Sequence, residues 1–324
     1  MVASMALACA PVFAAETTTE AAETKTEAVA AEEEEPDTGD ASKDDPRNQD
    51  DIGEKEILVV SFGTSFNDNR VATIGAIEQA IADKFEKDGW SVRRAFTADI
   101  IINHVKERDG EVIDNVEEAL KRARDNGVKQ LVVQPTHLMA GLEFEELTGT
   151  LQKYEADFEK IEIGKPLLDT DEDKKDVAED LVEATKSFDD GETAIVFMGH
   201  GTNHEANDVY TEMQDIIRKE AGNDNYFVGV VHDGAKPDVN DVLEEVKKNS
   251  GFKKVVLRDM MVVAGDHANN DMADPEDPES WYSTFKDAGY EVETVLEGLG
   301  QIEDIQEMYV DHCEDAVEKI TGED

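Results

Sequence analysis

The chain has 324 residues, of which 39% are hydrophobic, and its 31 Lys and Arg against 78 Asp and Glu give a net charge of −47. This deficit of cations excludes nucleic acid as a partner, because phosphate backbones are bound by clustered positive charge. The length suits one large domain or two of ordinary size.

The first fifteen residues are typical of an export signal. They are apolar, rich in small residues and too short to span a bilayer, so no transmembrane span is expected. No Lys or Arg precedes the apolar run, so we expect the true start to lie upstream. Two interpretations stay open, namely removal after residue 15 by signal peptidase or lipid attachment at Cys9. Both predict an exported protein, either periplasmic or extracellular.

Residues 16–53 are predicted to form a disordered acidic linker. They hold 14 acids and 3 bases, with no aromatic residue, and the rest of the chain still carries −36. Beyond the signal the chain has one cysteine, Cys313, so no internal disulfide is expected and this thiol is predicted to be a buried structural residue.

From about Lys55 onward the pattern alternates between strand and helix. The predicted strands are 57–60, 131–134, 194–198, 226–231, 255–257 and 292–296. The predicted helices are 69–87, 115–126, 144–155, 174–188, 207–219, 239–248 and 302–320. Strands separated by helices of this length predict parallel sheets covered on both faces.

Two pairs of segments repeat along the chain. Residues 57–65 (ILVVSFGTS) align with 195–203 (IVFMGHGTN), and 128–143 align with 252–267. The repeat predicts two similar Rossmann-like α/β domains, 54–190 and 191–324, whose parallel sheets face each other across a cleft. The last helix is free to pack back on the first domain.

The repeat also brings candidate metal ligands together. Ligands of open parallel sheets bind beyond the carboxyl ends of the strands, where His200, Glu143 and His267 all fall. Two imidazoles and a carboxylate suit a divalent transition metal. Taken singly, His200 also fits a helix-capping or turn residue, Glu143 a solvated acid at a helix start, and His267 either role. The sequence lacks HExxH, paired CxxC and a Lys-containing phosphate loop, so neither a structural zinc site nor an ATP site is expected.

These motifs resemble a known family. His200 in FMGHGTNH, Glu143 in HLMAGLEFE and His267 in VAGDHANNDM, together with SFGTS at 61–65 and RAFT at 94–97, are similar to the two-domain anaerobic sirohydrochlorin cobaltochelatases. The resemblance runs from about Lys55 to the C-terminus and implies the class II chelatase fold, related to ferrochelatase. It implies a lyase that inserts Co(II), or Fe(II) in some members, into sirohydrochlorin for cobalamin biosynthesis without ATP.

The resemblance also implies that His200 and His267 ligate the metal, with Glu143 nearby. Insertion needs a base for two pyrrole protons and a loosely held metal on one face of the ring. Our hypothesis gives His200 the role of base, because its ordinary pKa of about 6.5 lies near working pH. His267 and Glu143 then hold the metal with open positions.

Sirohydrochlorin carries eight carboxyl groups, so an acidic protein must bind it through local donors. The predicted donors and turn residues around the substrate are Ser61, Gly63, Thr64, Ser65, Arg94, Gly199, Gly201 and Thr202. Phe62 and Met198 are the expected floor beneath the macrocycle. For the hydroxyl residues, N-capping of helices is an equally good interpretation.

Several histidines lie outside this set. His232 stands where the family pattern leads us to expect a Glu and then an aromatic residue before Pro237, so it adds a ligand or a surface charge. His137 and His204 are candidates for hydrogen bonds that support the ligands, or plain turn residues, and His104 and His312 are expected at the surface.

Export is at odds with tetrapyrrole synthesis, which is cytosolic. The alternative function is therefore an exported tetrapyrrole- or metal-binding protein that kept the chelatase fold without turnover, and a third is a purely structural surface protein. The cellular metal, haem binding and a homo-oligomeric state are left open by the sequence.

Overall fold

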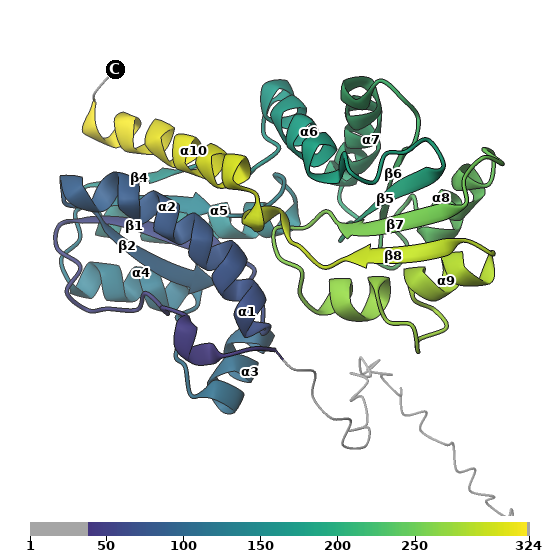
Figure 1. The fold of residues 1–324 in the computed structure, drawn as a ribbon. Coiled ribbons are helices and arrows are strands. Elements are labelled where there is room, and N and C mark those ends of the chain that lie inside the picture. The colour runs from purple at the N-terminus through teal and green to yellow at the C-terminus, as the bar shows by residue number, and fades with distance from the viewer. Residues whose placement is uncertain (1–37, 323–324) are drawn as a thin grey trace, which may run out of the picture. The chain divides into compact units, whose positions relative to one another are not determined.

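A computed structural model describes residues 38–322, and within them the chain forms two four-stranded parallel sheets (Figure 1). The first sheet has the order β2-β1-β3-β4 and the second the order β6-β5-β7-β8. Their strands are β1 Lys55–Ser61, β2 Ser91–Phe96, β3 Gln130–Pro135, β4 Lys160–Ile163, β5 Thr193–Gly199, β6 Tyr226–Val230, β7 Lys254–Asp259 and β8 Glu291–Val295. The equal order confirms the predicted pair of Rossmann-like folds.

Helices cover both faces of each sheet because the strands are apolar on both sides. They are α1 Asn67–Arg70, α2 Ala76–Phe85, α3 Asp99–Asp109, α4 Val116–Asp125, α5 Leu142–Tyr154, α6 Asp171–Thr185, α7 Asp208–Ala221, α8 Val239–Val246, α9 Trp281–Asp287 and α10 Glu303–Thr321. In the first sheet, Ile57 and Val59 share a core with α2 and α10, whereas Leu58 and Val60 face α4 and α5. In the second sheet, α6 and α7 contribute to one core, and α8 and α9 to the other. The predicted domain boundary at 190/191 falls between α6 and β5.

Four elements were absent from the sequence prediction, namely β2, β4, α3 and α9. In β2 the sequence pattern is hidden by two adjacent arginines. Because neighbouring strand residues point to opposite faces, Arg93 and Arg94 are buried on different sides of the sheet. Arg93 pairs with Glu56 and Asp114 at 2.9 Å, and Arg94 pairs with Glu78 at 2.7 Å. Each buried charge is therefore compensated, as burial requires.

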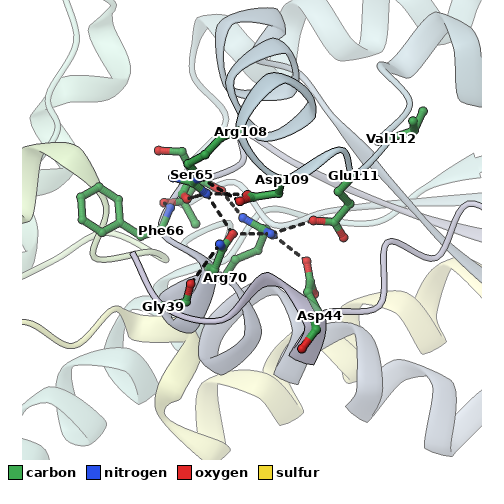
Figure 2. A network of polar contacts seen from close by, with 12 residues as sticks. Gly39, Asp44, Ser65, Phe66, Arg70, Arg108, Asp109, Glu111 and Val112 are labelled. Carbon is green, nitrogen blue, oxygen red and sulfur yellow. Dashed lines mark hydrogen bonds and ion pairs between the residues drawn. The ribbon is translucent and has the colours of Figure 1, made fainter. Parts of the chain in front are cut away.

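Residues 38–53, which we call the N-terminal arm, correct the linker prediction. The prediction placed them in a disordered stretch, but they pack against the first sheet. Asp44 forms ion pairs with the buried Arg70 and Arg94, Arg47 accepts a hydrogen bond from the Arg94 main chain at 3.2 Å, and Ile52 is 3% exposed. In Figure 2, dashed lines join the Arg70 guanidinium to the carboxylates of both Asp44 and Glu111. Charge pairing with arginines far along the chain orders a segment that its composition marks as disordered.

The last helix, α10, packs on the first sheet although it follows the second. Tyr309 is fully buried and donates a hydrogen bond to the Thr136 carbonyl at 3.0 Å, and Glu314 pairs with Lys84 at 2.7 Å. Cys313 is buried in the same core, where burial raises the pKa of its thiol. His312 is also buried rather than at the surface, with its Nε2 3.4 Å from Asp173 on α6. This helix therefore links the two halves of the fold.

The structure describes only part of the segment for which an export signal and a linker are predicted. The export signal, Cys9 and residues 16–37 lie outside the described residues. Within residues 38–322, no helix combines the length and apolar character needed to cross a membrane.

Candidate metal-handling site

His200 lies in the Gly199-His200-Gly201 turn that follows β5. Its Nδ1 is 2.8 Å from the Gly201 carbonyl, which can only accept, so Nδ1 carries the proton and Nε2 keeps a lone pair. A Cβ on Gly199 would stand 2.1 Å from the ring of Tyr210, and one on Gly201, whose φ is +82°, would stand 2.6 Å from Val230. The glycines are thus required by packing within the protein, independently of their predicted place around the substrate.

His267 lies in the loop after β7, immediately before a π-helical turn at Ala268–Met272. Its Nδ1 is 2.6 Å from Oδ2 of Asp271. The carboxylate fixes the ring and places the proton on Nδ1, which leaves the Nε2 lone pair for a metal. Turns of this kind are frequent at functional sites, because they redirect side chains out of the regular helical pattern.

The two predicted histidines are brought together by the fold. The ring centroids of His200 and His267 are 4.9 Å apart, and the rings cross at 63°. Burial lowers the pKa of His200, and the neighbouring charges of His267 and His232 lower it further. His200 is therefore neutral at neutral pH and can accept a proton or a metal.

A third imidazole, that of His232, lies beside this pair. Its ring centroid is 5.5 Å from that of His200, and its main-chain N–H donates to the His200 carbonyl at 2.7 Å. The amide nitrogen of Asn203 lies 3.1 Å from Nε2 of His232 and occupies that lone pair. His232, where the sequence departs from the family pattern, therefore places a third imidazole next to the predicted ligands. The Nε2 of this imidazole is already hydrogen-bonded to Asn203.

Glu143 stands in the first turn of α5, and its side chain is 47% exposed. Partial desolvation, followed by the nearby charge of Glu146, raises the pKa of its carboxyl. Its Oε2 lies 3.7 Å from Nε2 of His137. Burial raises the pKa of Tyr210 to about 12, and the charge of Glu143 raises it further. Glu143 therefore lies near Tyr210, whose hydroxyl accepts a hydrogen bond from Gly201 N–H.

The predicted set of three ligands is not preassembled. Among residues 38–322, no three His, Cys, Asp or Glu side chains lie close enough together to hold a metal ion. His200 and His267 adjoin each other, whereas Glu143 pairs with His137 on the first half. A pair of imidazoles alone suits a metal that must be released, since it leaves most coordination positions open.

Arg94, predicted to bind substrate carboxylates, is a structural residue. Its side chain is fully buried and makes two hydrogen bonds to Glu78 and two to Asp44, at 2.6–3.0 Å. Burial alone would lower its pKa, but these carboxylates hold the pKa far above the ordinary value. Four of its five N–H groups are engaged inside the protein and the side chain is buried, so these contacts favour a structural role for Arg94 over the predicted contact with substrate.

The remaining predicted substrate residues divide by exposure. Ser61 is 1% exposed and accepts from the Thr136 hydroxyl at 2.7 Å, and Thr64 is 3% exposed and accepts from Phe66 N–H at 3.2 Å. A Cβ on Gly63 would stand 2.6 Å from Phe96, and Met198 is fully buried in the second core, so it forms no floor for a ring. Phe62 is 47% exposed, and Ser65 and Thr202 are half-buried. These three remain predictions as substrate contacts.

Contacts join the loops of the two halves near these residues. Ala264 N–H donates to Oδ1 of Asn69 at 2.9 Å, and Nε2 of His204 lies 3.5 Å from Oε1 of Glu145. A Cβ on Gly265 would stand 2.9 Å from the Thr64 hydroxyl. The loops after β1, β3, β5 and β7 therefore form one neighbourhood, as the repeat predicts.

Comparison with solved structures agrees with this fold. The chain superposes on SirB from Bacillus subtilis with Fe3+ with a TM-score of 0.57 and 14% identity, covering 83% of this chain and 98% of that one. The cobalt complex of the sirohydrochlorin chelatase SirB from the same species gives 0.53, again with 14% identity and the same coverage. At such identity these likenesses establish the fold alone.

Comparison with known sequences identifies the family. A sirohydrochlorin cobaltochelatase of Salmonella typhimurium is 34% identical over 264 residues, which cover 81% of this chain and 96% of that protein. The sirohydrochlorin cobaltochelatase CbiKC of Nitratidesulfovibrio vulgaris is 29% identical over 265 residues, 81% of this chain and 90% of its own. The profile described as cobalt chelatase (CbiK) matches residues 55–318. This match and the Salmonella relative show that the chain belongs to the cobalt chelatase (CbiK) family, in agreement with its motifs, its two similar parallel sheets and the pair His200 and His267.

Proposed function

We propose that this protein is a sirohydrochlorin cobaltochelatase that inserts Co(II) into sirohydrochlorin, a step of anaerobic cobalamin biosynthesis. The observation that carries the proposal is the pair His200 and His267. Their rings are 4.9 Å apart, and each places its proton on Nδ1 through a fixed acceptor. Two Nε2 lone pairs are therefore available in one place without any rearrangement of tautomers.

The chemistry follows from the tetrapyrrole. Two N–H protons must leave the ring while the metal exchanges water for pyrrole nitrogens. His200 takes the two protons one after the other and passes each to solvent water, because its lowered pKa keeps the ring neutral at neutral pH. His267, oriented by Asp271, holds the incoming Co(II), and Glu143 supplies a carboxylate from the first half. No ATP is required, in keeping with the lack of a phosphate-cradling loop in the sequence.

The negative charge of the protein favours binding of the metal ion over binding of the tetrapyrrole. A net charge of −47 attracts divalent cations and repels an octacarboxylate. The substrate is therefore held by local groups, for which Phe62, Ser65 and Thr202 are the accessible candidates. We also propose that the protein acts outside the cytoplasm, on the basis of the apolar first fifteen residues.

The test is an insertion assay under anaerobic conditions with sirohydrochlorin and Co(II), followed by the change in the absorption of the macrocycle. The wild-type chain is expected to insert cobalt at a rate well above the uncatalysed reaction. His200→Ala is expected to lower kcat by about 10²- to 10⁴-fold, the range for loss of a general base. Binding of the tetrapyrrole with no insertion by the wild type would refute the proposal.

A further inference from the structure

The imidazole of His137, in the loop after β3, is buried without a hydrogen bond. His137 is 8% exposed, and neither of its ring nitrogens has a hydrogen-bond partner among residues 38–322. Phe144 packs edge-on against the ring, with centroids 6.5 Å apart at 80°. Buried polar groups are nearly always hydrogen-bonded, so a nearby group is expected to serve as the partner of this imidazole.

The group that can satisfy His137 is Glu143. The 3.7 Å between Nε2 and Oε2 is too long for a hydrogen bond, but a change of carboxylate rotamer closes such a gap. The half-exposed Glu143 side chain has room to make this change. Its carboxylate has two oxygens, so one can accept from His137 while the other binds a cation.

We propose that His137 is a positioning residue for Glu143: when Glu143 takes Co(II), Nε2–H of His137 donates to one carboxylate oxygen and presents the other to the metal. The proposal rests on the proposed function in assigning Co(II) to Glu143. A neutral imidazole has one N–H to donate, and Nε2 of His137 lies 3.7 Å from Oε2 of Glu143. The role is that of the groups which hydrogen-bond to metal-binding carboxylates and fix their orientation.

A purely structural histidine at this position would behave differently. Leucine has a similar volume and leaves no unsatisfied nitrogen in the core, so His137→Leu is expected to retain or raise the melting temperature. If His137 acts on Glu143, the same variant loses metal affinity while it gains or keeps stability. A positioning role thus lowers the Co(II) affinity of His137→Leu without lowering its melting temperature, whereas a purely structural role leaves the affinity unchanged.

The experiment titrates the full chain with Co(II) in the absence of tetrapyrrole and follows the ligand-field absorption of the metal. His137→Leu is expected to weaken Co(II) binding by about 10- to 100-fold, whereas His137→Gln, which keeps a donor, stays within about threefold of the wild type. In the Glu143→Gln background, His137→Leu is expected to have no further effect. In the insertion assay, KM for Co(II) rises and kcat is retained.

The matched control is His312, which is 6% exposed and lies on α10 against Asp173. His312→Leu is expected to lower the melting temperature and to leave Co(II) affinity unchanged. Unchanged Co(II) affinity in His137→Leu, or an equal loss in the Glu143→Gln background, would overturn the proposal. If the wild type binds Co(II) but inserts none, the proposed function fails, and the coupling between His137 and Glu143 is still decided by the titration.

Discussion

The carboxylate of Asp44 lies between two buried guanidinium groups, with Oδ2 2.6 Å from Nε of Arg70 and 2.6 Å from Nη1 of Arg94. Burial opposes its ionisation, but hydrogen bonds from Arg94 and then Arg70 hold the pKa of Asp44 below its usual value. Asp44→Asn leaves both arginines with less compensation, so we expect a loss of about 3 kcal/mol in the free energy of unfolding. Urea unfolding of Asp44→Asn measures this loss.

The exposed neighbour Asp51 provides a control, since Asp51→Asn is expected to change stability by no more than about 0.5 kcal/mol. Equal stability of the two variants would show that the ion pairs of Asp44 contribute nothing to the stability of the fold.

The orientation of His267 depends on Asp271. Removal of the carboxylate in Asp271→Ala frees the ring to rotate and to move its proton to Nε2. We expect Co(II) affinity to fall by about 10- to 100-fold, with little change in melting temperature. Titration with Co(II) measures the effect, and Asn270→Ala on the same exposed turn serves as the control. Wild-type affinity in Asp271→Ala would remove His267 from the ligand set.

The role of His232 can be separated from that of its neighbour. Because Asn203 already occupies its Nε2 lone pair, His232 is expected to act as a neighbour of His200 and not as a ligand. His232→Ala should therefore keep the cobalt insertion rate within about tenfold of the wild type, in contrast to the loss of about 10²-fold or more in His200→Ala. A loss as large in His232→Ala would make all three imidazoles essential.

Asp259, at the end of β7, gives a prediction for stability against pH. It is fully buried, and the Met261 main-chain N–H and the charge of Arg258 only partly offset the cost of ionising it there. Burial raises its pKa well above the ordinary value. Because the folded-state pKa exceeds the unfolded one, the cost of Asp259 is absent below about pH 3.9 and grows by about 1.4 kcal/mol per pH unit above it, up to the folded pKa.

Asp259→Asn is therefore expected to be more stable than the wild type at pH 8, by about 2 kcal/mol or more, and equal to it near pH 4. Denaturant unfolding at both values tests this. The exposed Asp287→Asn should show no such divergence. A wild type that is more stable than Asp259→Asn at pH 8 would mean that the charged carboxylate has a favourable partner.

The sequence predicted the repeat of the fold well, because apolar strands ending in glycine turns are local patterns. His200 and His267 were found for the same reason, since each follows a strand that occupies the same place in its sheet. Arg94 could not be interpreted locally, because its partner Asp44 lies fifty positions away in a segment whose composition predicts disorder. The pairing of His137 with Glu143 likewise depends on how the loop after β3 turns back on α5, which no spacing in the sequence specifies.

The position of α10 has a consequence for how the chain folds. Tyr309, Cys313, Ala316 and Ile320 fill the core between α10 and the first sheet. They follow all four strands of the second sheet in the chain, so one face of the first sheet lacks its cover until both sheets have been synthesised. The N-terminal half therefore completes its core after the C-terminal half has emerged, which reverses the usual order in which domains fold during synthesis.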